Sequence, residues 1–456
     1  MKGTNSNRVV IVGAGFGGLN AAKTLASAPA KITLVDQKNY HTFQPLLYQV
    51  ATAGLSPGEI ASPIRSILRH HKNIEVLMAE VTAFDLERRM VQAADQEIPY
   101  DWLIVAAGAS HAYFGHDEWE PFAPGLKTIE DALEIRRRVL LAFELAERRA
   151  SAGQNCDPLN FVVVGAGPTG VELAGTLAEI CHHALSHDFR SIDPRNTTIR
   201  LIEGGPRVLP AYPEDLSRSA QDQLQRLGVE VLTSTMVIGI EAGVIHMSGP
   251  RADEARMNAS VILWAAGVAA SPLGKKLGVP VDRAGRVQVE RDLSLPGHPE
   301  VFVIGDLAAL KDATGKLLPG VAPVAILEGR YVGRLIKHEI ALAGTSSKAL
   351  PRRPFHYFDK GSLATIGRAA AVAEFGKVHI SGYIAWLAWL FVHILFLIGF
   401  RNRVLVFIQW AWSYLTYERG ARLITGNSNL PGWTASQSGD FITGENEKET
   451  SSAAHK

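Results

Sequence analysis

Two sets of three glycines in this 456-residue chain have the spacing G-x-G-x-x-G, and each set directly follows an apolar run typical of a buried β-strand. The sets are Gly13, Gly15 and Gly18, and Gly165, Gly167 and Gly170. In such a motif the first glycine permits a tight turn, the second lets backbone amides approach a pyrophosphate, and the third lets the following helix pack closely. The phosphates bind at the helix N-terminus, where unpaired N–H groups favour an anion. The sequence therefore predicts two sites for dinucleotide cofactors.

Each glycine motif is followed by an acidic residue that could bind a ribose. Asp36 comes 23 residues after Gly13, close to the usual spacing of about 20. Glu203 comes 38 residues after Gly165, and a polar insert around Ser186–Asn196, expected to be an extended helix and loop, accounts for the excess. A carboxylate accepts hydrogen bonds from both ribose hydroxyls and repels a 2′-phosphate, so NADH is favoured over NADPH.

The elements around these motifs predict an α/β fold built from two copies of one nucleotide-binding unit. The first unit ends in the apolar run Trp102–Gly108, and the second ends in the similar run Val261–Gly267. A helical linker is expected from about Thr128 to Ala150. A later strand, Val301–Ile304, leads to Gly305 and Asp306. We expect this late strand to complete the first unit, with the second unit inserted between its two parts.

A helix is expected shortly after that strand, with Pro323 near its start, where the missing N–H costs nothing. In this arrangement Asp306 falls where the ribityl chain of a flavin passes. The helix N-terminus, near Ala322, would then stabilise the negative charge that develops on a reduced flavin. An ordinary capped core helix is the alternative interpretation.

Composition and cysteine content exclude several classes of protein. The composition, 47% hydrophobic and 20% charged, is typical of a globular protein. The net charge of +1 gives no reason to expect nucleic-acid binding. The first strand is expected at about Arg8 after a short polar lead, so no secretory signal is visible and the catalytic body is expected to face the cytoplasm. Cys156 and Cys181 form no C-x-x-C or metal-ligand pattern, so neither a disulfide framework nor a metal site is expected.

Two paired nucleotide folds with Gly305-Asp306 resemble the flavoprotein superfamily typified by glutathione reductase. The disulfide reductases of that superfamily carry a C-x4-C pair, but no cysteine lies between Tyr40 and Gly54, so dithiol chemistry is excluded. The segments Phe43–Thr52 (FQPLLYQVAT) and Gly170–Gly175 (GVELAG) closely resemble the type II NADH dehydrogenases, which are non-proton-pumping NADH:quinone oxidoreductases. The resemblance covers about Arg8–Arg422 and implies noncovalent FAD in the first unit, NADH in the second, and a membrane quinone as the electron acceptor.

The motifs and the resemblance together give the candidate site residues. Those for FAD are Gly13, Gly15, Gly18, Asp36, Val81, Gly108, Asp306 and Ala322. Those for NADH are Gly165, Gly167, Gly170, Glu203 and Gly267. Glu172 matches the family's glutamate beside the flavin, which implies a catalytic role in nicotinamide or proton handling. The alternative is that Glu172 is a first-turn acid that complements the helix dipole, an interaction worth about 0.3–1 kcal/mol. Lys360 matches a family position near the quinone entrance, where a surface lysine in a turn is the alternative.

The expected quinone-site helix departs from the family pattern. That helix commonly reads A-Q-x-A-x-Q, and this chain has Pro323 and Leu327 at the two glutamine positions, so two amides that could contact a quinone are absent. Two other functions therefore stay open: a flavin-dependent NADH oxidase or diaphorase that uses oxygen or a soluble acceptor, and an NADH-sensing scaffold similar to apoptosis-inducing factor. An apolar segment near the C-terminus favours a lipid-soluble acceptor, and hence FAD-dependent NADH oxidation with two-electron transfer to a membrane quinone.

That apolar segment runs from Gly382 to Phe400, and its nineteen residues are enough to span a bilayer. It is followed by Arg401–Arg403 and by a second apolar stretch, Val404–Leu415, which is too short to cross. Aromatic and arginine flanks suit helices that lie in the headgroup zone, and the resemblance implies monotopic attachment within one leaflet. A transmembrane helix at about 382–400 and a buried homodimer interface are the alternatives. His393 is expected to be packed or interfacial.

These expectations divide the chain into six segments. They are an FAD-binding domain in two parts (1–127 and 276–345), a helical linker (128–158), an NADH-binding domain (159–275), a membrane-anchoring region (346–425) and a disordered tail (426–456). The expected location is the cytoplasmic face of the inner (cell) membrane.

Overall fold

The computed structural model describes residues 7–250, 255–343, 351–416 and 419–426, so nearly all of the expected tail lies outside the described residues. The chain forms two compact units, and each is assembled from segments that are far apart in the sequence. Unit 1 takes its described residues from 1–42, 61–110 and 268–359. Unit 2 takes them from 43–60, 111–267 and 360–456.

Unit 1 is built on a six-stranded sheet whose strands come from the two ends of the unit. In spatial order they are β20 (Ser294–Leu295), β21 (His298–Val303), β9 (Trp102–Val105), β1 (Asn7–Val12), β2 (Ala30–Asp36) and β5 (Ile74–Met78). All neighbours are parallel except β20, which runs antiparallel to β21. Because Val303 pairs with Val105 in parallel register, the late strand completes the first sheet, as the sequence predicts.

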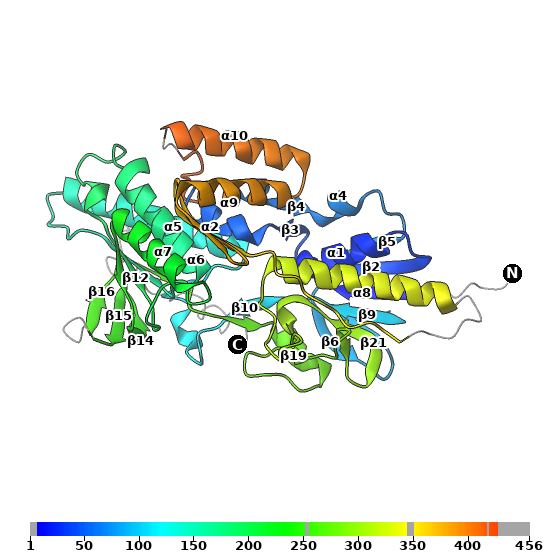
Figure 1. Cartoon of the computed structure of the whole chain (residues 1–456). Coiled ribbons are helices and arrows are strands. Elements are labelled where there is room, and N and C mark those ends of the chain that lie inside the picture. The colour runs from blue at the N-terminus through cyan, green and yellow to red at the C-terminus, as the bar shows by residue number, and fades with distance from the viewer. Residues whose placement is uncertain (1–6, 251–254, 344–350, 417–418, 427–456) are drawn as a thin grey trace, which may run out of the picture. The chain divides into compact units, whose positions relative to one another are not determined.

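Two helices of unit 1 begin at or next to predicted cofactor residues, and they lie side by side (Figure 1). They are α1 (Phe16–Leu25) and α8 (Ala322–Ala343), and α8 begins with Pro323 as its second residue, as predicted. A Cβ atom on Gly329 of α8 would lie 2.1 Å from the carbonyl oxygen of Gly17, so the two backbones touch where they cross. Glycine is therefore required at this crossing.

Smaller elements complete unit 1. An antiparallel sheet contains β6 (Val81–Asp85), β7 (Met90–Ala93) and β8 (Gln96–Pro99). A second antiparallel pair joins β3 (Tyr40–Thr42) to β4 (Ala61–Pro63), which is followed by the short helix α4 (Ile64–Leu68).

Unit 2 repeats the nucleotide-binding topology in a four-stranded parallel sheet. In spatial order its strands are β13 (Val229–Leu232), β12 (Thr198–Ile202), β11 (Asn160–Val164) and β17 (Val261–Trp264). Its helices are α5 (Ile129–Ser151), α6 (Pro168–Glu179) and α7 (Glu214–Arg226). Thr128 and Asp131 form a capping box at the start of α5, which confirms the predicted linker helix. A π-helical turn at Ile180–Ala184 extends α6 before the long loop that the sequence indicates.

Further elements of unit 2 come from chain segments before, within and after the part that forms the four-stranded sheet. Its antiparallel strands are β14 (Met236–Glu241), β15 (Val244–Ser248) and β16 (Arg256–Asn258), and, near the C-terminus, β23 (Ser362–Gly367), β24 (Ala370–Phe375) and β25 (Val378–Ser381). Two short helices also belong to unit 2: α2 (Leu47–Ala51), which lies in the segment Phe43–Thr52, and α3 (Pro57–Ile60), which follows that segment.

Each of the two C-terminal apolar stretches forms one helix. They are α9 (Tyr383–Phe396) and α10 (Phe400–Thr416), which lie side by side in Figure 1. Leu397 is extended with ψ 134°, and Gly399 has φ +89°, so the chain turns between them. At 1.5 Å per residue the fourteen residues of α9 rise about 21 Å, short of a hydrocarbon core of about 30 Å. The considered transmembrane helix at 382–400 is therefore not formed, and no helix among the described residues is long and apolar enough to cross a bilayer.

Candidate nucleotide-binding sites

The two glycine motifs fold into the same local structure. Gly13 has φ +97° and Gly165 has φ +96°, a region that side chains rarely adopt. A Cβ atom on Gly18 would lie 1.8 Å from the carbonyl oxygen of Gly13, and a Cβ on Gly170 would lie 1.8 Å from that of Gly165. Both contacts are far shorter than two heavy atoms allow, so the first and third glycines of each motif are fixed by sterics.

The second glycine of each motif faces open space. Gly15 and Gly167 are the N-cap residues of α1 and α6, neither helix has a side-chain cap, and a Cβ on either glycine would meet no atom within 4 Å. The first amides of each helix therefore face an open cradle, which fits a pyrophosphate. This is the arrangement that two dinucleotide cofactors need.

The predicted ribose acids hold the same position relative to the two turns. Asp36 accepts hydrogen bonds from the amides of Ala14 (2.6 Å) and Lys38 (2.7 Å). Glu203 accepts them from the amides of Ala166 (2.8 Å) and Gly205 (2.7 Å). Burial raises the pKa of Asp36, and these amides partly offset that effect. Each carboxylate oxygen retains a lone pair that could accept a bond from a ribose hydroxyl.

In unit 2 a cavity of about 530 Å³ opens beside this acid. Its volume lies within the range of about 300–1,000 Å³ that small-molecule sites have. The lining residues are Phe114, His116, Trp119, Val164, Gly165, Ile202, Glu203, Gly204, Gly205, Thr235, Met236, Val237, Trp264 and Ala266. A Cβ on the predicted residue Gly267 would lie 2.5 Å from the ring of Phe114, so Gly267 borders the same aromatic wall.

Sequence reasoning missed the aromatic part of this cavity. Phe114, His116 and Trp119 come from a segment without helical or strand periodicity, which gave no signal. His116 stacks on Trp119 with ring centroids 4.2 Å apart, and Trp119 meets Trp264 edge-on at 5.7 Å. These rings provide flat apolar surfaces for a planar base.

In unit 1 the structure brings the late FAD candidates close to the glycine motif. A Cβ on Gly17 of α1 would lie 3.0 Å from the Ile304 side chain and 3.4 Å from the carbonyl oxygen of Ala325 in α8. A Cβ on Gly320, just before α8, would lie 3.2 Å from Oδ1 of Asp306. The start of α1, Asp306 and the Ala322 end of α8 therefore share one neighbourhood.

The other two FAD candidates have different surroundings. Gly108 has φ +68°, and a Cβ there would meet no atom within 4 Å, so it borders open space. Val81 begins β6 and belongs to the buried core of unit 1.

Glu328 of α8 is a buried acid that sequence reasoning did not select. Glu328 is only 1% exposed, and its Oε2 accepts a hydrogen bond from the amide of Gly305 at 2.6 Å. Burial raises the pKa of Glu328 to about 8, and the nearby Asp306 adds to that rise. The sequence did hold a signal, since Glu328 comes four residues after the buried Val324 and so lies on the apolar face of α8.

Glu172 is the fifth residue of α6, so the alternative of a first-turn acid is wrong. Burial raises its pKa to about 8, and a hydrogen bond with the backbone of Thr365 partly offsets that rise. Burial, and then Glu172, also raise the pKa of Tyr48 well above its usual value, which places this tyrosine of the FQPLLYQVAT segment near the acid. A protonated carboxyl at neutral pH is a group that could exchange protons.

The remaining candidates differ in their surroundings. Lys360 is exposed before β23 and lines neither of the two cavities described here. On α8, Pro323 is exposed and Leu327 is half-buried. His393 stacks on Trp389 at 4.2 Å, and its Nδ1 donates to the carbonyl oxygen of Trp389 at 2.7 Å, so its imidazole is packed within α9.

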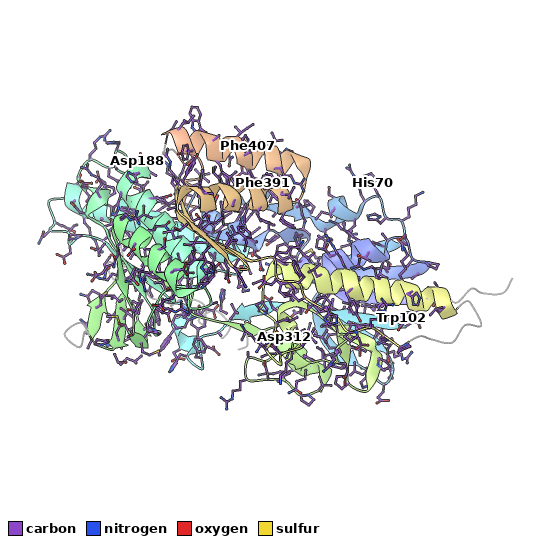
Figure 2. The ribbon with its side chains drawn as sticks, viewed as in Figure 1. His70, Trp102, Asp188, Asp312, Phe391 and Phe407 are labelled. Atoms are coloured by element: carbon purple, nitrogen blue, oxygen red, sulfur yellow. The ribbon has the colours of Figure 1, made fainter. Side chains whose placement is uncertain are left out.

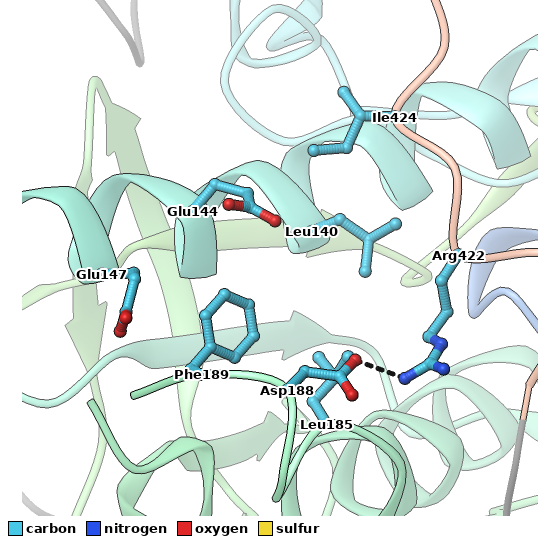
Figure 3. A pocket seen from close by; sticks show the side chains of 8 residues that line it. All are labelled: Leu140, Glu144, Glu147, Leu185, Asp188, Phe189, Arg422 and Ile424. Atoms are coloured by element: carbon cyan, nitrogen blue, oxygen red, sulfur yellow. Dashed lines mark hydrogen bonds and ion pairs between the residues drawn. The ribbon is translucent and has the colours of Figure 1, made fainter. Parts of the chain in front are cut away.

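A second cavity of unit 2, of about 230 Å³, contains none of the predicted residues (Figure 3). Its lining residues are Leu140, Glu144, Glu147, Leu185, Asp188, Phe189, Arg422 and Ile424. Arg422 forms an ion pair with Asp188, and Glu147 accepts hydrogen bonds from the loop amides of Arg190 and Ser191. These contacts tie the segment after α10 and a loop to α5, which is a structural role.

Comparison with known proteins defines the class first. Residues 7–329 match the family model described as pyridine nucleotide-disulphide oxidoreductase, and residues 359–417 match the model described as NDH2 C-terminal domain. The chain is therefore an oxidoreductase with two dinucleotide-binding folds.

Relatives give the particular family. The type II NADH:quinone oxidoreductase NdhA of Mycobacterium tuberculosis is 48% identical over 92% of this chain and 89% of its own length. A type II NADH:quinone oxidoreductase of Staphylococcus aureus is 30% identical over 81% of this chain and 90% of its own length. The chain belongs to the type II NADH:quinone oxidoreductases. The solved structure of NDH2 from Plasmodium falciparum in complex with NADH shares the fold, with a TM-score of 0.80 at 22% identity over 92% of this chain and all of that one.

Proposed function

We propose that unit 1 binds FAD and that unit 2 binds NADH. As a type II NADH:quinone oxidoreductase the chain oxidises NADH and passes two electrons to a quinone without pumping protons, which sets aside the soluble-acceptor and sensor alternatives. FAD, when bound, accepts hydride from NADH and delivers the electrons to the quinone. The protein's own task is to bind and orient the two cofactors.

The duplicated cradle is the observation that carries this proposal. In unit 1 the amides at the start of α1 would hold the FAD pyrophosphate, Asp36 would bind the ribose, and Asp306 with the first turn of α8 would hold the rest of the cofactor. In unit 2 the start of α6 and Glu203 would do the same for NADH. The cavity beside Glu203 has aromatic walls and suits a nucleotide that must enter and leave at each turnover.

Filling one cradle at a time tests the assignment. Gly167→Val places a branched side chain where the NADH pyrophosphate would bind, so the purified protein should remain yellow but no longer bleach with anaerobic NADH. Gly15→Val should yield protein with little FAD. A visible spectrum before and after NADH reads both properties. If Gly15→Val kept its flavin while Gly167→Val lost it, the assignment of the two units would be reversed.

Attachment to the lipid surface is proposed for α9 and α10. On α9 only Ala385 and Trp389 are buried, although nearly every residue of the helix is apolar. The exposed large apolar residues of the two helices are Tyr383, Ile384, Leu387, Phe391, Leu395, Phe396, Val404, Phe407, Ile408, Trp412 and Leu415. Figure 2 shows Phe391 and Phe407, which are 67% and 54% exposed. Such a surface suits monotopic insertion into one leaflet, with the protein on the cytoplasmic face of the cell membrane.

Vesicle binding tests this attachment. Burying a large apolar side chain is worth about 1.5–3 kcal/mol, so Phe391→Ser with Phe407→Ser should weaken co-sedimentation with lipid vesicles by on the order of 100-fold or more. The control is Ile238→Ser with Val268→Ser, which changes two similarly exposed apolar residues outside α9 and α10. Unchanged vesicle binding, with loss of a dimer in analytical ultracentrifugation, would instead make this face a homodimer interface.

We further propose catalytic roles for two residues, on the basis of the sequence pattern and of their local structure. Glu172 would handle protons, because its carboxyl is held protonated near neutral pH. Lys360 would act near the quinone entrance, where its exposed ammonium group could meet an approaching acceptor.

A further inference from the structure

His41, in strand β3 of unit 1, contains a buried nitrogen that lacks a hydrogen-bond partner. The residue is 3% exposed. Its Nδ1 lies 2.8 Å from the carbonyl oxygen of Ala14, the residue between the first two glycines of the motif. Because a carbonyl oxygen only accepts hydrogen bonds, Nδ1 must carry the proton. The other ring nitrogen, Nε2, is buried and has no partner in the part of the chain that the structure describes.

Comparison of the two units shows that holding the turn does not require a histidine. In unit 1 the Ala14 peptide is fixed on both sides, with its N–H donating to Asp36 and its carbonyl accepting from His41. In unit 2 the equivalent Ala166 donates to Glu203, but its carbonyl accepts from the backbone amide of Leu209 at 2.8 Å. A backbone amide is therefore sufficient for the clamp. What His41 adds is a second nitrogen beside the cofactor turn.

A buried nitrogen without a partner is uncommon in native proteins and indicates a missing ligand atom or water. We propose that His41 is an FAD-binding residue outside the glycine motif, with Nδ1 holding the turn and Nε2 forming a hydrogen bond with an oxygen of the bound cofactor. This inference rests on the assignment of FAD to unit 1. It makes His41 a specific feature of the FAD unit, because among the described residues of unit 2 a backbone amide holds the equivalent carbonyl.

The protonation state selects the kind of FAD oxygen. Burial lowers the pKa of His41 and outweighs the hydrogen bond to Ala14, which raises it; the positive charge of Lys23 on α1 lowers it further. The neutral ring is therefore favoured at pH 7. With its proton on Nδ1, the neutral ring has only a lone pair at Nε2. A hydroxyl of the ribose or ribityl chain can donate to that lone pair, whereas a phosphate oxygen carries no proton to donate at this pH.

Two amide variants separate the functions of the two nitrogens. In His41→Asn the amide nitrogen takes the position of Nδ1, so the clamp on Ala14 remains and Nε2 is lost. In His41→Gln the amide reaches the position of Nε2, and the clamp on Ala14 is lost. FAD affinity is measured by titrating apoprotein with FAD and following the quenching of flavin fluorescence, and apoprotein stability is measured by its thermal midpoint.

We expect His41→Asn to weaken FAD binding by roughly 3- to 30-fold, the range of one lost hydrogen bond, while the apoprotein midpoint stays near that of the native chain. His41→Gln should show the opposite pattern, with a lower midpoint and FAD affinity closer to native. His182→Asn is the control, since His182 of unit 2 also faces a backbone carbonyl, that of Leu227, at 3.1 Å. It should leave FAD affinity unchanged.

Native FAD affinity in His41→Asn would overturn the proposal and assign Nε2 to water. A failure of the unit assignment looks different, because Gly15→Val would then keep its FAD. The two results are therefore distinguishable.

Discussion

Replacing Glu328 by glutamine should make the protein more stable at alkaline pH. Glu328 is buried, and its pKa is raised from an ordinary 4.5 to about 8. Ionising it in the folded state is therefore costly, whereas in the unfolded chain it ionises freely above pH 4.5. The stability that depends on its neutral form is complete below pH 4.5 and is lost as the pH rises through 8.

The size of the effect follows from the same pKa. One pKa unit corresponds to about 1.4 kcal/mol, so the total loss is about 5 kcal/mol, of which about 3–4 kcal/mol falls between pH 5 and pH 8.5. Glu328→Gln cannot ionise, and its amide oxygen can still accept the hydrogen bond from Gly305. The variant should thus match the native protein closely at pH 5 and exceed it increasingly toward pH 8.5.

Thermal denaturation of both proteins across pH 5–8.5, with saturating FAD, measures the difference. We expect the midpoint difference to grow by several degrees over this range. Glu87→Gln, an exposed acid in the same unit, is the control and should give a difference that does not depend on pH. A midpoint difference for Glu328→Gln that stayed constant, or shrank with rising pH, would refute the reasoning.

Three further predictions concern the two cofactor units. Burial raises the pKa of Glu172 to about 8, so the rate of flavin reoxidation by a short-chain quinone should change near pH 8 in stopped-flow measurements. This change should vanish in Glu172→Gln. Identical pH profiles of the two proteins would argue against a proton-handling role. Glu203→Gln should weaken NADH binding about tenfold or more and reduce the preference for NADH over NADPH, which the ratio of kcat/KM values measures, and an unchanged ratio would contradict the ribose assignment. Gly329→Ala places a Cβ 2.1 Å from the carbonyl oxygen of Gly17, so it should destabilise unit 1 by about 1–3 kcal/mol and lower the FAD content. The control is Gly58→Ala, where a Cβ meets no atom within 4 Å. Equal FAD content in both variants would count against a tight crossing of α1 and α8.

Features set by short stretches of chain were predictable. The glycine spacing at Gly13–Gly18 and Gly165–Gly170 is enough to specify the turn, because the clash that forbids a side chain lies within the motif itself. The capping box at Thr128 is equally local, and the helix it begins was expected. Even the completion of the first sheet by the late strand was predicted, since parallel strands of one nucleotide-binding unit need a common sheet.

Side-chain environments were harder to predict. Glu328 and Glu172 look like ordinary helical acids, and only the packing around them raises their pKa to about 8. The aromatic wall at Phe114–Trp119 lines the cavity beside Glu203 only because the fold brings Trp119 against Trp264 of β17. The two apolar stretches were expected, but the end of the first was not: α9 ends at Phe396, and the turn at Gly399 lets α10 begin at Phe400.

By itself the sequence determined the two glycine turns, because backbone sterics act over a few residues, and it identified the acids Asp36 and Glu203 that lie beside them. Only the tertiary structure decided which buried groups are neutral, which ring of unit 1 holds the Ala14 turn, and which apolar residues of the two C-terminal helices are exposed. Desolvation and hydrogen bonding are set by whatever atoms surround a group, and for Glu328, Glu172 and His41 those atoms come from distant parts of the chain.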